Sequence, residues 1–186
     1  IAQVVKAHDR VTGETPTGES YRANDTELLD WVQATATFGF CEAYRAFAGA
    51  LSDAEVDRLY AEGAQAATLY GATGAPRSRL EIDAMFAAMA PKLERSDIVF
   101  EFLDIVRAAP ILPSRSLQKL LIRGAVEIIP GWARDILGLG KKQGLQTGGA
   151  QVLRAIGVAA ERVPILSAPP AQACARMGLP GDFLYR

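Results

Sequence analysis

Histidine is scarce in this chain of 186 residues, because His8 is its only representative. One imidazole excludes the HExxH helix of zinc proteases, the two-histidine iron site and the paired Glu-x-x-His motifs of di-iron bundles. A Ser–His–Asp triad would need His8 as its base, and no G-x-S-x-G turn accompanies it. An enzyme that holds another metal through protein ligands alone is therefore hard to assemble from this sequence.

Cysteine is also rare, and its two positions, Cys41 and Cys174, are far apart in the chain. No CxxC spacing exists, which excludes a zinc ribbon and a thioredoxin-type redox centre. Both residues lie among alanines, so we expect them to be buried free thiols. Reduced thiols fit a cytoplasmic location, which we take as the expectation.

Long apolar runs and an excess of charge are absent as well. No apolar stretch reaches the roughly 18 residues of a membrane-spanning helix, and no signal peptide is visible. The formal net charge of −1 provides no electrostatic footprint for nucleic acid or an anionic membrane. The chain begins at Ile1, inside an amphipathic segment, so we expect residues that precede Ile1 in the full protein.

Helical spacing of apolar residues dominates what is present, and residues 24–50 show it first. Asn24 or Asp25 can cap the first turn, and Glu27 follows Asn24 at the spacing of a capping box. The apolar face that we predict for this helix consists of Leu28, Val32, Thr35, Phe38 and Gly39, with Trp31 at its edge.

The next segment, residues 51–72, has a second capping box in Ser52 and Glu55, and its predicted apolar face comprises Val56, Leu59, Tyr60 and Gly63. A third helix should have Leu80, Met85 and Met89 on its apolar side, and Pro91 should kink or end it. Further helices are predicted over residues 96–108, 114–129, 130–140, 148–163 and a short stretch after 169.

Strand patterns are not convincing anywhere in the chain. The segment TGETPTGES, residues 12–20, is rich in Gly, Pro, Ser and Thr and is predicted to be a loop. The segment DIVFEF could be extended, but it fits the helical template at least as well. We therefore predict an all-α fold, a single-domain multi-helix bundle that spans residues 1–186.

Two linked patterns stand in the first 45 residues. VVKAHDRVTG reads V-x-x-x-H-x-x-V-x-G around His8, and the segment from Tyr21 to Thr35 reads Y-x-A-x-D-x-x-x-L-x-W-V-x-A-T. An aromatic-rich helix that ends in Glu-Ala-Tyr follows. Together these resemble the helical family that groups the catalytic domain of bacterial rubber oxygenase (latex clearing protein) with the fungal endoplasmic-reticulum oxygenase of mycophenolic acid biosynthesis. LSDAEVDRLYAE, AAPILP and IIPGWARDILGLG extend the resemblance to about residue 140.

The resemblance implies a b-type haem among the helices, with His8 as the proximal iron ligand. It also implies that Trp31, Gln33 and Thr35 belong to the cofactor-binding region and that the substrate is an apolar small molecule or lipid-like. Relatives commonly have W-V-H-A-T where this chain has Gln33, which can neither bind iron as imidazole does nor change charge near neutral pH. No catalytic residue is assigned.

Structural roles compete with these assignments. His8 could fix a helix end against the loop, Tyr21 and Trp31 could be core aromatics, Asp25 a helix cap and Thr35 a packed residue. The alternative function is a cofactor-free helical protein that binds an apolar ligand or a protein partner, which Gln33 favours. The sequence does not decide the oligomeric state, and a homo-oligomer stays open.

Overall fold

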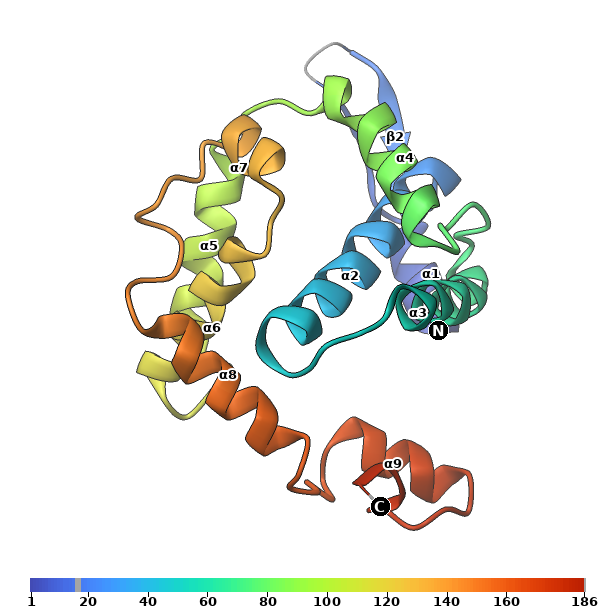
Figure 1. The fold of residues 1–186 in the computed structure, drawn as a ribbon. Helices are drawn as coiled ribbons and strands as arrows, with labels where there is room; N and C mark the ends of the chain where they lie inside the picture. The colour runs from blue at the N-terminus through green and yellow to red at the C-terminus, as the bar shows by residue number, and fades with distance from the viewer. Residues whose placement is uncertain (16–17, 186) are drawn as a thin grey trace. The chain divides into compact units, whose positions relative to one another are not determined.

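The computed structural model describes residues 1–15 and 18–185, and it confirms the all-α class. Within these residues the chain forms nine α-helices, three short 3₁₀ helices and one two-stranded sheet. The α-helices, labelled as in Figure 1, are α1 (Ala2–His8), α2 (Thr26–Phe47), α3 (Asp53–Ala67), α4 (Arg79–Met89), α5 (Ile98–Ala108), α6 (Arg115–Glu127), α7 (Gly131–Leu137), α8 (Gly149–Ala160) and α9 (Pro169–Arg176). The 3₁₀ helices are η1 (Thr68–Tyr70), η2 (Ala90–Lys92) and η3 (Phe183–Tyr185), and the strands are β1 (Thr12–Glu14) and β2 (Ser20–Arg22).

The chain divides into two compact units. The first comprises residues 1–42 and 51–95, and the second comprises residues 43–50 and 96–186. The assignment of one domain to residues 1–186 stays a prediction.

The core of the first unit lies where α2, α3 and α4 meet. Its buried side chains are Ala34, Phe38, Cys41, Val56, Tyr60, Ile82 and Phe86. The rings of Phe38 and Phe86 meet edge to face with their centroids 5.0 Å apart. Arg79, at the start of α4, donates to Glu42 of α2 at 2.8 Å, and its guanidinium lies 5.8 Å from the centre of the Phe38 ring. Aromatic packing and this ion pair therefore join α4 to α2.

The buried face of α2 differs from the predicted one. Phe38 is buried as expected, but Ala34 and Cys41 accompany it, whereas Leu28 is exposed and Val32 is 63% exposed. Leu80 of α4 is likewise exposed where we predicted a packed residue, and the helix buries Ile82 and Phe86 instead. The spacing of apolar residues was correct for helices, but the chain offers two apolar stripes, and α3 and α4 cover the one with the smaller side chains.

Capping is confirmed in one helix and wrong in another. At α3, the Glu55 amide donates to Ser52 Oγ at 3.3 Å and the Ser52 amide donates to Glu55 Oε2 at 2.8 Å, so the predicted capping box forms. At α2 the helix begins at Thr26, and the side-chain oxygen of Asn24, Oδ1, accepts no hydrogen bond. The capping box predicted for Asn24 is therefore wrong, because Asn24 lies one residue too early and its side chain points toward α1.

The segment predicted as a loop, residues 12–20, contributes to a small hairpin. β1 pairs antiparallel with β2, with Gly13 opposite Tyr21. A Cβ atom at Gly13 would come within 2.6 Å of the Tyr21 hydroxyl, so the ring covers the glycine. Tyr21 is 39% exposed, and its assignment as a core aromatic is wrong. Pro16 and Thr17, also within the predicted loop, lie outside the described residues.

The second unit is built on α5, α6 and α8, with α6 packed on both of the others. Gln118 of α6 is buried, and its amide donates to the carbonyl oxygens of Val106 at 2.6 Å and Ala109 at 2.8 Å. Arg115 adds a 2.7 Å bond to the Ala108 carbonyl oxygen. These side chains satisfy the last carbonyl groups of α5, which the helix itself leaves without partners.

Both cysteines of the chain, Cys41 and Cys174, are buried thiols, as predicted. In the part of the chain that the structure describes, no helix combines the length and the apolar character needed to cross a bilayer.

Candidate functional site

His8 is the last residue of α1, a helix on which no residue is buried. Its side chain is half-buried. Residues spaced three and four apart share a helix face, so His8 shares an apolar stripe with Ile1, Val4 and Val5. Ile1 and Val4 are both exposed. Among residues 1–15 and 18–185, no hydrogen bond or ion pair engages the imidazole.

Asn24 attaches this helix to the segment that precedes α2. Its amide nitrogen donates to the Val5 carbonyl oxygen at 3.1 Å and to Asp9 Oδ1 at 2.6 Å. Asp25, next in the chain, occupies the cap position of α2, but its side chain accepts from the Arg22 amide at 2.7 Å. The side-chain amide of Asn24 therefore fixes the C-terminal end of α1 through two hydrogen bonds.

Trp31 packs within the core of the first unit. Its ring meets Phe86 edge to face at 5.5 Å, and it lines a pocket of about 360 Å³ with Glu27, Asp30, Met85, Ala88, Met89 and Lys92. Lys92 donates to Glu27 at 2.6 Å, and this bond raises the pKa of the Lys92 ammonium. The structural role proposed for Trp31, an aromatic packed against the core, is thus present in the structure.

Thr35 is half-buried, and its hydroxyl is used within its own helix. Thr35 Oγ1 donates to the carbonyl oxygens of Trp31 at 2.9 Å and Val32 at 3.0 Å. Such a bond to the preceding turn is the ordinary arrangement of threonine in a helix. The packed role predicted for Thr35 is consistent with this geometry.

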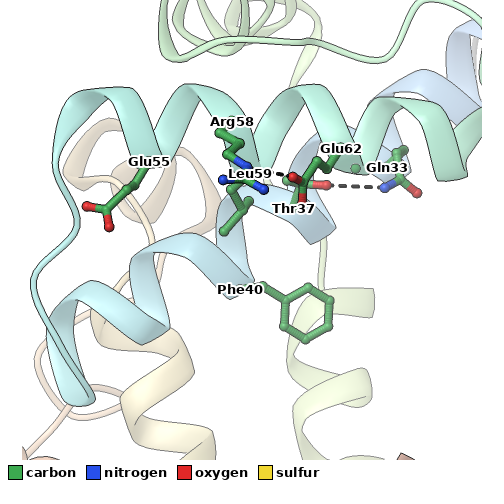
Figure 2. A pocket seen from close by; sticks show the side chains of 8 residues that line it. Gln33, Thr37, Phe40, Glu55, Arg58, Leu59 and Glu62 are labelled. Carbon is green, nitrogen blue, oxygen red and sulfur yellow. Dashed lines mark hydrogen bonds and ion pairs between the residues drawn. The ribbon is translucent and has the colours of Figure 1, made fainter. Parts of the chain in front are cut away.

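Gln33 lies on a different face of α2 and lines a pocket between α2 and α3 (Figure 2). The pocket has a volume of about 490 Å³, and its lining residues are Gln33, Thr37, Phe40, Glu55, Arg58, Leu59, Glu62 and Gly63. Gln33 Nε2 donates to Thr37 Oγ1 at 3.2 Å, one turn along the helix. Phe40 is 76% exposed and is the largest apolar side chain that lines the pocket.

The rim of this pocket carries one ion pair. Arg58 Nε donates to Glu62 Oε1 at 2.7 Å, and this bond raises the pKa of the guanidinium. Glu55, also on the rim, has a lowered pKa because the Ser52 hydroxyl and amide both donate to it. The pocket lining thus combines charged side chains with the apolar side chains of Phe40 and Leu59.

Tyr60 brings a polar group into the core of the first unit. Its side chain is fully buried, and its hydroxyl has no hydrogen-bond partner. Burial raises the pKa of the phenol. The phenol therefore stays protonated throughout the physiological range.

The predicted site residues do not converge on one described pocket. Trp31 and Gln33 line different pockets on α2, and neither pocket is lined by His8. The assignment of His8, Trp31, Gln33 and Thr35 to a cofactor site stays a prediction. Sequence reasoning did not find Phe40, Arg58 and Glu62, since their meeting depends on how α3 packs on α2. The spacing of Arg58 and Glu62, four residues apart, was the one signal available.

Metal binding by protein side chains alone has no support in the described residues. Outside Pro16, Thr17 and Arg186, no group of three or more His, Cys, Asp or Glu side chains is arranged to hold an ion.

The described residues thus form an all-α structure with an open pocket between α2 and α3. Residues 1–163 match the family model described as ER-bound oxygenase mpaB/B'/Rubber oxygenase, catalytic domain. The chain therefore belongs to this family of oxygenase catalytic domains, which confirms the resemblance. No curated protein and no solved structure matches the chain.

Proposed function

We propose that this protein is a haem-b-dependent oxygenase-like protein in which His8 is the proximal iron ligand. The substrate class that we propose is an apolar small molecule or a lipid-like molecule. The observation that carries the proposal is the imidazole of His8, half-buried on an apolar stripe of α1 and free of hydrogen bonds in the described residues. Membership in a family of oxygenase catalytic domains supports the reaction class.

The residues present fit a haem in their donor chemistry. A neutral imidazole is the commonest haem ligand, and a ring without a partner keeps a nitrogen available for iron. The exposed side chains of Ile1 and Val4 offer apolar surface beside His8, which a porphyrin would cover. His8 would hold such a haem, which would supply the binding and activation of dioxygen.

The remaining residues would orient the bound haem and exclude water from it. Ile1, Val4 and Val5 would keep water from the His8 side of the ring. Gln33 replaces the family's histidine with a group that does not titrate, so we expect it to fix its neighbours by hydrogen bonding only, as its bond to Thr37 illustrates.

The test is a haem titration of purified protein followed by the Soret band. We expect saturable uptake of one haem per chain, and a loss of affinity of at least about 100-fold in His8→Ala. Lys6→Ala is the matched control, because Lys6 lies on the same short helix and is exposed. It should bind haem as the parent does. Absence of uptake, or equal affinity in His8→Ala and the parent, would overturn the proposal.

A second candidate rests on the pocket at Gln33, which His8 does not line. Here the protein binds an apolar ligand without a cofactor, and the pocket of Phe40 and Leu59 holds it. Native mass spectrometry should then detect a copurifying apolar molecule, and Phe40→Asp should release it while His8→Ala retains it. Release by both variants would contradict this candidate.

A further inference from the structure

We infer that Asn24 is a positioning residue for His8: its amide nitrogen fixes the last turn of α1, and its buried carbonyl oxygen accepts the N–H of the imidazole. The other ring nitrogen then carries the lone pair that a metal needs. This inference deepens the proposed function and rests on it for its purpose, although the hydrogen bond itself can exist without any cofactor.

The first observation is where the Asn24 amide lies. It donates to the carbonyl oxygen of Val5 and to the carboxylate of Asp9, which are four residues apart on α1 and its end. His8 lies between these two anchors in sequence, and residues 5, 8 and 9 share one side of a helix. The Asn24 side chain is therefore held on the side of α1 that also carries His8.

The second observation is an acceptor without a donor. Asn24 Oδ1 is buried and has no hydrogen-bond partner, and a buried acceptor of this kind destabilises the fold when it stays unpaired. The amide cannot be turned over to relieve this, because Nδ2 already donates twice, to acceptors that have no proton to give in return. Among the side chains of Val5, His8 and Asp9, only the imidazole of His8 carries an N–H.

These two observations complement each other. The imidazole of His8 is a donor without an acceptor, and the carbonyl oxygen of Asn24 is an acceptor without a donor, on the same side of one helical turn. The inference requires that rotation of the imidazole about its side-chain bonds brings its N–H to Asn24 Oδ1. A hydrogen bond to one ring nitrogen fixes the tautomer and the ring plane, which is how proteins commonly orient a histidine that binds metal.

The test uses the fact that His8 is the only histidine, so that ¹⁵N-histidine labelling yields two ring signals and no assignment is needed. In cofactor-free protein at a pH where the ring is neutral, we expect the two ¹⁵N shifts to be far apart, as one locked tautomer requires. Asn24→Ala should bring them toward the averaged values of a free histidine side chain.

Asp9→Ala is the matched control, because it removes one anchor of the amide but leaves the carbonyl oxygen of Asn24 in place. It should retain the locked tautomer. Averaged shifts in the parent protein would overturn the inference whether or not Asn24→Ala folds, and so would unchanged shifts in a folded Asn24→Ala variant. An ordered water that bonds to Asn24 Oδ1 in place of His8 corresponds to this outcome.

Haem titration of the same variants separates this inference from the proposed function. Asn24→Ala should weaken haem binding by about 10–100-fold and His8→Ala by more. A locked tautomer in a protein that takes up no haem would overturn the haem proposal and leave the Asn24–His8 bond standing. Haem uptake with averaged ring signals in the cofactor-free protein would do the reverse.

Discussion

The helix that carries the lone histidine and the three helices that form the first core are built in opposite ways. α1 buries none of its residues, whereas α2, α3 and α4 bury Phe38, Val56, Tyr60 and Ile82 among others. Trp31 and Thr35 have side-chain contacts in or beside that core, whereas the imidazole of His8 makes no hydrogen bond or ion pair among the described residues. The comparison indicates that the stability of the first unit depends on its core helices.

The largest effect that this comparison predicts is in the core. Ile82→Ala should lower the free energy of unfolding by about 3 kcal/mol, because Ile82 is 0% exposed and its removal leaves a cavity among packed rings. Denaturant unfolding followed by circular dichroism measures it. Val32→Ala, on the open face of α2, is the control and should change the value by less than about 0.5 kcal/mol. Equal losses in both variants would mean that the open face of α2 is covered in solution.

Local patterns explain what the sequence could predict of this fold. The box of Ser52 and Glu55 needs four consecutive residues only, and the helical period identified the segment DIVFEF as part of α5. The hairpin was not predicted, because its strands are three residues long and one of them contains Gly13, although glycine is uncommon in strands. It forms where the ring of Tyr21 covers Gly13, a contact between two strands that no single segment reveals.

Non-local packing decided the rest. Leu28 and Val32 fit a helical stripe as well as Ala34 and Cys41 do, so the choice of face depends on where α3 and α4 pack. The pocket of Gln33 likewise needs Leu59 and Glu62 from α3. For the candidate site, the sequence identifies His8 and Gln33 as unusual residues. It does not show that Gln33 lines a pocket that His8 does not line.

A smaller effect is expected at the start of α3. Ser52→Ala should cost about 1 kcal/mol at neutral pH, because the first amide groups of the helix lose an acceptor. The pKa of Glu55 is lowered in the folded protein, so its contribution is complete above the ordinary value of 4.5 and is lost as the pH falls through the lowered value. Thermal unfolding at neutral pH and near pH 3 measures this. A penalty in Ser52→Ala that grows in acid would contradict the assignment.

The open side of α2 should respond with the opposite sign. Gly39 lies inside the helix, and a Cβ atom there would meet no other atom within 4 Å. Gly39→Ala should therefore raise the free energy of unfolding by about 0.8 kcal/mol, the difference between the two residues in a helix interior. Chemical unfolding of this variant beside Val32→Ala tests it. A loss of stability would show that another surface packs closely against Gly39.

The smallest expected effect is at His8 itself, and it separates a structural role from a binding role. If His8 fixed the end of α1 against the hairpin, its removal would cost about 1 kcal/mol or more, as lost hydrogen bonds of this kind do. The imidazole makes no hydrogen bond in the described residues, so in an Asn24→Ala background, where the bond inferred above is absent, His8→Ala should change the free energy of unfolding by less than about 0.5 kcal/mol. Denaturant unfolding without cofactor measures this, with Lys6→Ala in the same background as the reference on the same helix. A loss of about 1 kcal/mol for His8→Ala but not for Lys6→Ala would return His8 to a structural role, and a small change combined with loss of haem binding in His8→Ala would identify it as a ligand that the fold does not need.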